Sequence, residues 1–224
     1  MAAQVLVLTG RGRYEDPWHD HAATSALVVD ALREQGVDAR LRSTFPDALD
    51  DVDALRAVVV NAGRGRSDPD FDGDDAAWRG FHDRLHALVA AGTGVLGLHQ
   101  AASTFADDPR WAALLGGSWT ARSWHPPLAE ARFAVRDADH RVTRGLAEVV
   151  AVDEQYCDLE VRGARVLLTT RHDGVDHPVV WAAPGPHRVL YDALGHDVRS
   201  YASASRRALL ARELDWVMGA RAPR

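Results

Sequence analysis

The stretch from Gly92 to Thr104 constrains the fold more than any other part of the sequence. A glycine at its start ends a helical pattern, and the short apolar run Val95–Leu98 follows. The polar pair His99-Gln100 comes directly after this run, without a spacer. This order predicts a strand, a sharp turn and a helix. Because ligands bind at the carboxyl ends of strands in open α/β sheets, His99 is a candidate site residue.

Gly97, two residues before His99, strengthens this interpretation. In a nucleophile elbow, small neighbours allow one side chain to project from a tight strand-to-helix turn. The projecting residue here is a histidine, where a nucleophilic elbow has Ser or Cys. A core histidine that hydrogen bonds to backbone groups is the alternative interpretation.

Short apolar runs alternate with helical patterns in the first half of the chain. Residues 4–9 and 57–61 are apolar almost throughout, as expected for strands covered on both faces, and a further strand is predicted over 37–41. Helices are predicted after residue 20, over 50–55, and before Gly92. The last of these has one apolar face, formed by Trp78, Phe81, Leu85, Leu88 and Val89. Strands that alternate with helices in this way predict a parallel, doubly wound sheet.

The second half of the chain has a different pattern. A short helix is predicted over 111–115. Strands are predicted over residues 130–135, 149–152, 164–169 and 178–181, with no helices between them. This arrangement favours antiparallel strands added at a sheet edge. A further strand over 187–194 and a final helix over 203–218 complete the chain, and because no linker interrupts it, residues 1–224 are predicted to form a single domain.

Charge and hydropathy exclude several classes of partner. The formal net charge is -6, and acidic and basic residues are mixed along the chain, which argues against nucleic-acid binding. No apolar run approaches the roughly 20 residues that a membrane span requires. The start of the chain also lacks a basic, apolar leader. We therefore expect a soluble, cytoplasmic protein that contacts neither nucleic acid nor membrane.

The residue types that are absent restrict the chemistry. All 26 basic residues are arginines, so a Schiff-base lysine and a phosphate-binding P-loop lysine are excluded. The single cysteine, Cys157, cannot form an intramolecular disulfide or a cysteine-based zinc cluster. Catalysis would have to use His, carboxylates, Tyr, Arg or a metal.

Three histidines follow predicted strands at distant points of the chain. They are His19, His99 and His196, and a doubly wound sheet would bring the corresponding strand ends to one cleft. Neutral imidazole suits both acid-base catalysis and metal binding. His82 and His86 have the i, i+4 spacing of a metal pair, but no third ligand lies nearby in the sequence, and we expect them at the surface.

Acidic and aromatic residues supply further candidates. Asp153-Glu154 follows a predicted strand, where it either begins a helix or offers a carboxylate for acid-base chemistry. Trp181 is expected in the core. Tyr14, Trp119 and Trp124 lie in predicted loops, where aromatic rings next to polar groups often bind neutral polyhydroxylated ligands.

Taken in order, these motifs resemble the trehalose-utilisation, ThuA-like family. Each motif alone is weak, but the ordered set is specific and runs from about Val5 to Trp216. The matching segments are Leu8-Thr9-Gly10, Trp18-His19-Asp20, Val95–Ala102, Leu115-Gly116-Gly117, Trp124-His125-Pro126, Asp139-His140, Gly145-Leu146, Asp153–Tyr156, Arg188–Tyr191 and Leu194-Gly195-His196. The chain departs from the usual pattern at two places. Arg141 stands where the family commonly has Pro, and Pro186-His187 precede Arg188 where the family usually has Gly-Lys-Gly.

The resemblance implies a flavodoxin-like, mostly parallel sheet with antiparallel edge strands, as in class I glutamine amidotransferases. That larger group has a nucleophilic Cys at the elbow, where this chain has His99, so thiol chemistry is not expected. The family is associated with the catabolism of trehalose-type disaccharides and their keto derivatives. Residues carried over by motif are His19, His99, His125, Glu154, Tyr156, Arg188 and His196.

The sequence therefore predicts an enzyme that acts on a small carbohydrate by His/carboxylate acid-base chemistry. His99, Glu154, His19 and His196 are the predicted catalytic residues. Tyr14, Trp124, His125, Tyr156 and Arg188 are the predicted substrate-binding residues. A divalent metal on the histidines is compatible with the sequence, whereas no nucleotide cofactor is expected; a homo-oligomer is also compatible. The alternatives are a non-catalytic carbohydrate-binding or regulatory module and a metal-dependent hydrolase.

Overall fold

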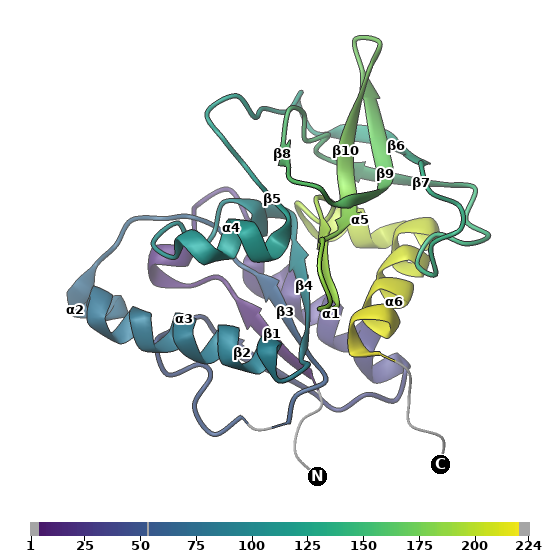
Figure 1. The fold of residues 1–224 in the computed structure, drawn as a ribbon. Helices are drawn as coiled ribbons and strands as arrows, with labels where there is room; N and C mark the ends of the chain where they lie inside the picture. The colour runs from purple at the N-terminus through teal and green to yellow at the C-terminus, as the bar shows by residue number, and fades with distance from the viewer. Residues whose placement is uncertain (1–4, 53, 220–224) are drawn as a thin grey trace.

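A computed structural model describes residues 5–52 and 54–219, which form a nine-stranded sheet with the order β2-β1-β3-β4-β11-β10-β9-β6-β7 (Figure 1). A separate two-stranded sheet pairs β5 with β8. The strands are β1 (Val5–Thr9), β2 (Ala39–Ser43), β3 (Ala57–Asn61), β4 (Gly94–Leu98), β5 (Gly117–Ser118), β6 (Ala129–Val135), β7 (Glu148–Asp153), β8 (Glu160–Val161), β9 (Arg165–His172), β10 (Val175–Ala182) and β11 (Val189–Asp192).

The first half of the sheet is parallel. Strands β2, β1, β3, β4 and β11 run in the same direction. Every residue of β1, β3 and β4 is buried, because helices cover both faces of these strands. The continuous apolar runs therefore predicted the parallel sheet correctly, although Gln4 of the first predicted strand lies outside the described residues.

The second half of the sheet is antiparallel, as the sequence pattern predicted. Strand β10 pairs antiparallel with both β11 and β9, and β6 pairs antiparallel with both β9 and β7. Buried and exposed residues alternate along β7, as expected for a strand with one covered face. Figure 1 shows these strands above the carboxyl ends of the parallel strands, so the two halves of the sheet meet where ligands are expected to bind.

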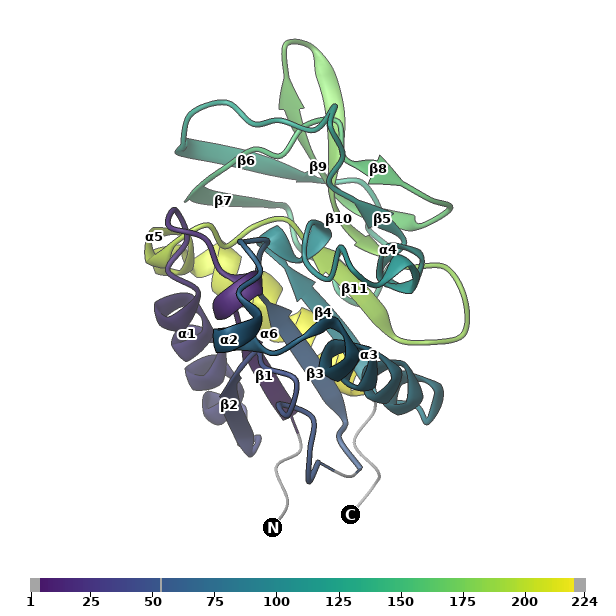
Figure 2. The ribbon, with the colours of Figure 1, turned by 90° about the vertical axis from the view of Figure 1, so that its left-hand side faces the viewer.

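Helices cover the two faces of the parallel strands. Helices α1 and α6 pack together on one face, and α3 lies on the other (Figure 2). The helices are η1 (Gly12–Tyr14), α1 (His21–Glu34), α2 (Pro69–Asp72), α3 (Asp75–Ala90), η2 (His99–Ala102), α4 (Pro109–Leu115), α5 (Val198–Ala202) and α6 (Ala204–Met218). The predicted apolar face of α3 is buried at all five of its positions. No helix in the described ranges is long and apolar enough to span a membrane.

Three local predictions were wrong. No helix forms over 50–55, since Asp51 and Ala54 have left-handed φ angles of 54° and 55°, which interrupt a right-handed helix; residue 53 lies outside the described residues. The turn after β4 is the single 3₁₀ turn η2, and the next α-helix begins only at Pro109.

The third concerns His82, which is buried and not at the surface. Its Nε2 atom lies 3.2 Å from Asp107, and its ring packs edge-on against Phe105. His86 is partly buried and contacts Asp108 at 2.7 Å. The loop that follows η2 supplies these acidic partners, and the i, i+4 pattern within the helix gave no information about that loop.

Candidate functional site

His99 occupies a strained turn at the carboxyl end of β4. Its φ angle is 47°, a left-handed value that a non-glycine residue adopts at a cost of about 1–3 kcal/mol. A Cβ atom at Gly97 would lie only 2.8 Å from the side chain of Leu115, so the strand before the turn has no room for a larger residue there. The hydroxyl of Tyr191 donates a hydrogen bond to the carbonyl oxygen of His99 at 2.7 Å. The turn thus has the geometry of an elbow, with an imidazole at its tip.

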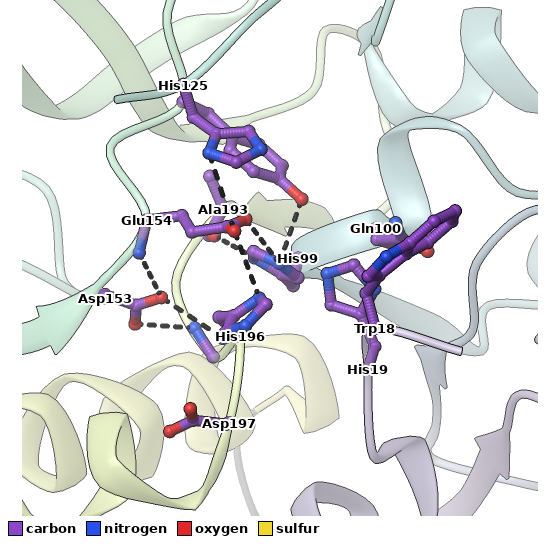
Figure 3. A network of polar contacts seen from close by, with 12 residues as sticks. Trp18, His19, His99, Gln100, His125, Asp153, Glu154, Ala193, His196 and Asp197 are labelled. Carbon is purple, nitrogen blue, oxygen red and sulfur yellow. Dashed lines mark hydrogen bonds and ion pairs between the residues drawn. The ribbon is translucent and has the colours of Figure 1, made fainter. Parts of the chain in front are cut away.

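Hydrogen bonds fix the orientation of the His99 ring. Its Nδ1 atom lies 2.7 Å from the carbonyl oxygen of Ala193, which can only accept, so Nδ1 carries a proton. The Nε2 atom lies 2.9 Å from the hydroxyl of Tyr156 and 3.4 Å from a carboxylate oxygen of Glu154. His99 therefore directs Nε2 toward residues that follow β7 (Figure 3).

His19 enters the same region from the loop that follows β1. Its Nδ1 atom lies 2.7 Å from Asp16 Oδ1, whereas its Nε2 atom is buried and has no hydrogen-bond partner. The backbone N–H of Trp18 also donates to Asp16, at 2.9 Å. Asp16 thus orients the His19 ring so that a bare nitrogen faces His99 and His196, whose ring centroids are 5.0 and 4.7 Å away.

Glu154 and His196 complete the cluster from two further strand ends. One oxygen of Glu154 lies 3.4 Å from His196 Nδ1, and the other lies 3.4 Å from His99 Nε2. The buried carboxylate of Asp153 accepts hydrogen bonds from the backbone N–H groups of Glu154, Gly195 and His196, at 3.0, 2.8 and 3.1 Å. Asp153 therefore ties the two loops together and sets the spacing of their side chains.

The surroundings of these groups shift their pKa values in different directions. Burial lowers the pKa of His19 and outweighs its contact with Asp16, which acts in the opposite direction. The Glu154 carboxylate raises the pKa of His196 by more than burial lowers it. Burial also raises the pKa of Glu154, but His196 and His99 outweigh this effect and hold that pKa well below its ordinary value. Glu154 is therefore ionised.

These four side chains form one compact set of donor atoms. One donor atom each from His19, His99, Glu154 and His196 lies within 4.8 Å of the other three. This geometry permits proton transfer within the cluster or coordination of a metal ion. We refer to the four residues below as the His/Glu cluster.

A pocket of about 450 Å³ opens above the cluster, within the range of about 300–1,000 Å³ typical of small-molecule sites. His19 and Glu154 reach its surface, and Trp119, Tyr156 and His125 form an aromatic wall. The Trp119 and Tyr156 ring centroids are 4.6 Å apart. The other lining residues are Arg64, Gln100, Ala102, Ser103, Thr104, Phe105, Ala106, Asp108, Pro109, Trp111, Ala112 and Ser118.

Three predicted substrate-binding residues lie elsewhere. Tyr14 is buried against Trp78 and Phe105, and its hydroxyl donates to Asp107 at 2.7 Å, so it belongs to the core under α3. Trp124 does not line the pocket, and its indole N–H donates to Asp158 at 3.1 Å.

Arg188 lies at the opposite end of the sheet. It directly precedes β11, which runs parallel to β4, so it is placed at the amino ends of these strands and His99 at their carboxyl ends. Its guanidinium donates to the carbonyl oxygens of Val217 and Gly92, at 3.0 and 2.8 Å. These contacts assign Arg188 a structural role.

The sequence analysis missed the two residues that position the cluster. Asp16 orients His19, and the only signal for it was an acidic residue three positions before a candidate histidine. Asp153 was considered only together with Glu154, and nothing in the sequence indicates that it accepts bonds from the loop around His196. The role of Asp153 depends on a contact between segments that are distant in the chain, whereas that of Asp16 depends on how one short loop folds.

The fold and the site together define an α/β sandwich of the class I glutamine amidotransferase type that has a histidine at the elbow. Comparison with known proteins agrees. The ThuA family, described as "Trehalose utilisation", matches residues 4–217. The chain therefore belongs to the ThuA family.

Solved structures support the same assignment of the fold. A ThuA-like protein from Parabacteroides merdae is 18% identical, with a TM-score of 0.79 over 97% of this chain and 90% of that one. A ThuA-like protein from Bacteroides uniformis is also 18% identical, with a TM-score of 0.69 over 96% and 92%. A glutamine amidotransferase from Thermotoga maritima is 8% identical, with a TM-score of 0.61 over 98% and 100%. No curated protein matches the chain.

Proposed function

We propose that this protein is an enzyme that acts on a trehalose-type disaccharide, or on a keto derivative of one, by proton transfer at the His/Glu cluster. Membership of a family described by trehalose utilisation indicates a role in sugar metabolism. The observation that carries the proposal is that two residues of the cluster, His19 and Glu154, line a pocket with an aromatic wall. Aromatic rings pack against the C–H faces of sugars, and polar groups bind their hydroxyls.

A keto sugar bound in this pocket would place its carbonyl oxygen against the imidazoles. Glu154, which is ionised and reaches the pocket, would take the proton from the carbon next to the carbonyl. The C–H electron pair would form a carbon–carbon double bond, and the carbonyl π pair would move to the oxygen, where a histidine N–H stabilises or neutralises it. Isomerisation follows when the former carbonyl carbon receives a proton while the hydroxyl on the adjacent carbon gives up its own and becomes the new carbonyl. Elimination follows when the enolate re-forms its carbonyl and expels a β-oxygen substituent, which takes a proton from a histidine.

The alternative function is a non-catalytic carbohydrate-binding module. The acid-base enzyme is favoured because polar groups that only bind a neutral sugar do not require three imidazoles around one buried, ionised carboxylate. A binding module would show saturable sugar binding without product.

Turnover of a 3-keto disaccharide, followed by chromatography and NMR of the products, tests the proposal. Glu154→Gln and His99→Ala are expected to reduce kcat by about 100-fold or more, in line with the loss of an acid or base. His187→Gln is the matched control, since this histidine precedes β11 at the far end of the sheet. If wild-type protein binds the sugar and forms no product, or if both variants keep full turnover, the proposal is wrong.

A further inference from the structure

Two buried nitrogen atoms of the His/Glu cluster have no hydrogen-bond partner among the described residues. They are His19 Nε2 and His196 Nδ1, the second of which lies 3.4 Å from a Glu154 oxygen in an ion pair without hydrogen-bond geometry. Burying a polar atom without a partner costs about 1–3 kcal/mol, and such atoms in a native structure call for an explanation. Both belong to the set of side chains whose donor atoms lie within 4.8 Å of one another. The four side chains therefore bring one donor atom each to a common point, and two of them carry a nitrogen without a hydrogen bond.

From this convergence we infer that His19, His99 and His196 bind a divalent transition-metal ion, with Glu154 beside it. Imidazole nitrogens with one carboxylate suit Zn²⁺ and neighbouring first-row ions, whereas Mg²⁺ and Ca²⁺ prefer oxygen ligands. The inference deepens the proposed function, and only the catalytic role of the ion rests on that function. Metal binding itself is measured without substrate.

The rings of His19 and His99 are oriented as metal-binding histidines usually are. Such histidines usually donate the N–H of their other nitrogen to a carboxylate or a backbone carbonyl, which fixes the tautomer and aims the bare nitrogen at the ion. His19 directs Nδ1 to the carboxylate of Asp16 at 2.7 Å, and His99 directs Nδ1 to the carbonyl of Ala193 at 2.7 Å. In both residues Nε2 is left for the ion.

Negative charge around the cluster would offset that of the ion. Glu154 contacts both His99 and His196, and Asp16 contacts His19. The hydroxyl of Tyr156, which lies 2.9 Å from His99 Nε2, would have to turn to another acceptor when a metal binds that nitrogen. An oxygen of Glu154 or of a bound sugar would serve. Bound in this place, the ion would supply Lewis-acid polarisation of a carbonyl oxygen.

With His19, His99 and His196 as its ligands and Glu154 beside it, an ion here would keep a coordination position for water or substrate. His19 and Glu154 line the pocket, whereas His99 is almost completely buried behind them. Catalytic zinc sites characteristically have three protein ligands and one position for water or substrate. The site therefore fits a catalytic ion better than a structural one.

Zn²⁺ binding to the full chain, after removal of metals with a chelator, tests the inference. Calorimetric titration is expected to show one Zn²⁺ per chain, and Co²⁺ at the same site should give the visible absorption of a low-coordinate nitrogen environment. His19→Gln and His196→Gln should each weaken Zn²⁺ binding by about 100-fold, and Asp16→Asn by about 10-fold to 100-fold through loss of ring orientation. His187→Gln is the control and should bind as wild type does.

His99→Gln could perturb the elbow itself, so the less buried His19 and His196 decide the result, with circular dichroism to verify folding. If wild-type protein does not bind Zn²⁺ or Co²⁺, or if both decisive variants bind as tightly as wild type, the inference is overturned. Product formation by protein without metal would leave the proposed acid-base function standing. Conversely, metal binding without turnover of any keto sugar would contradict the proposed function and keep the metal site.

Discussion

The imidazole of His99 donates its Nδ1 proton to the carbonyl oxygen of Ala193, 2.7 Å away. His99 directly follows β4 and Ala193 directly follows β11, and these two strands are parallel neighbours in the sheet. A side chain at one strand end is thus held by the backbone at the next. This contact sets the direction of Nε2 and with it the geometry of the whole cluster.

We expect neutral His99 to be the Nδ1–H tautomer. Long-range ¹H–¹⁵N correlation spectra of protein labelled at histidine, recorded without metal and at a pH about two units above the ordinary histidine pKa of roughly 6.5, distinguish the two tautomers. Comparison with the spectrum of His99→Gln assigns the signals. A neutral ring that carries its proton on Nε2 would contradict the hydrogen bond to Ala193.

Gly63→Ala is expected to disturb the site from outside the cluster. A Cβ atom at this buried position would lie 1.9 Å from Gln100 Oε1 and 2.9 Å from Asp16 Oδ2, so both side chains must move. Because Asp16 orients His19, we expect turnover to fall by about 10-fold or more and stability to fall by about 1–3 kcal/mol.

Gly80→Ala is the matched control for this change. A Cβ atom at Gly80 would meet no atom within 4 Å, and the residue lies inside helix α3. This variant should keep full turnover and gain about 0.5–1 kcal/mol of stability from helix propensity. Unfolding in urea and initial rates compare the two variants. Full activity of Gly63→Ala would mean that Asp16 does not position His19.

The sequence predicted the arrangement of the cluster because strand ends can be located from local patterns. The apolar runs of β1 and β4 mark where each strand stops, and a parallel sheet brings those ends to one edge. His19 and His99 could be grouped on this basis alone. The hydrogen bonds that orient the two rings could not be predicted, because one acceptor is the backbone of a distant segment and the other depends on the conformation of a loop.

Tertiary packing explains why two predicted substrate-binding residues, Tyr14 and Arg188, lie away from the pocket. Tyr14 follows β1 in a loop, as a ligand-binding residue would, but its ring turns inward against Trp78. Arg188 lies near a site motif in the sequence, but at the amino end of β11. Which way a loop residue turns, and which end of a strand it flanks, depends on tertiary packing that a single sequence does not show.

Arg188→Ala is therefore expected to affect stability and not substrate binding. The substitution removes hydrogen bonds to the carbonyl oxygens of Val217 and Gly92, with an expected loss of about 1–2 kcal/mol in the free energy of unfolding. KM for the keto sugar should stay within about twofold of wild type, since the residue is at the opposite end of the sheet from the pocket. A large increase in KM with unchanged stability would place Arg188 at the substrate.

Cys157 is expected to be inert in the folded protein. The side chain is fully buried, and burial, together with the nearby charge of Asp158, raises the pKa of the thiol to about 11. Since the thiolate is the reactive form, a disulfide reagent should label this cysteine slowly in native protein and rapidly in guanidinium. Cys157→Ala should keep its turnover. Rapid native labelling together with loss of turnover would instead indicate thiol chemistry.

Asp107 provides a pH-dependent contribution to stability away from the His/Glu cluster. Burial raises the pKa of this carboxyl, but contacts with His82 and Tyr14, at 3.2 and 2.7 Å, outweigh that effect and lower the pKa to about 2. In the unfolded chain the pKa of an aspartate is about 3.9. A group whose pKa is lower in the folded state stabilises the protein above the unfolded pKa and loses this contribution as the pH falls through the folded one.

Asp107→Asn should therefore lower the free energy of unfolding at neutral pH by about 1 kcal/mol, a value reduced for the partial exposure of the side chain. The difference from wild type should shrink between about pH 4 and pH 2, as Asp107 becomes protonated first in the unfolded chain and then in the folded one. Asp70→Asn, at an exposed position of α2, is the control and should show no such trend. Urea unfolding followed by circular dichroism across this range measures the effect. A wild-type advantage that stays constant down to pH 2 would show that ionised Asp107 is not the stabilising form, and that the contacts of its oxygens with Tyr14 and His82 act independently of charge.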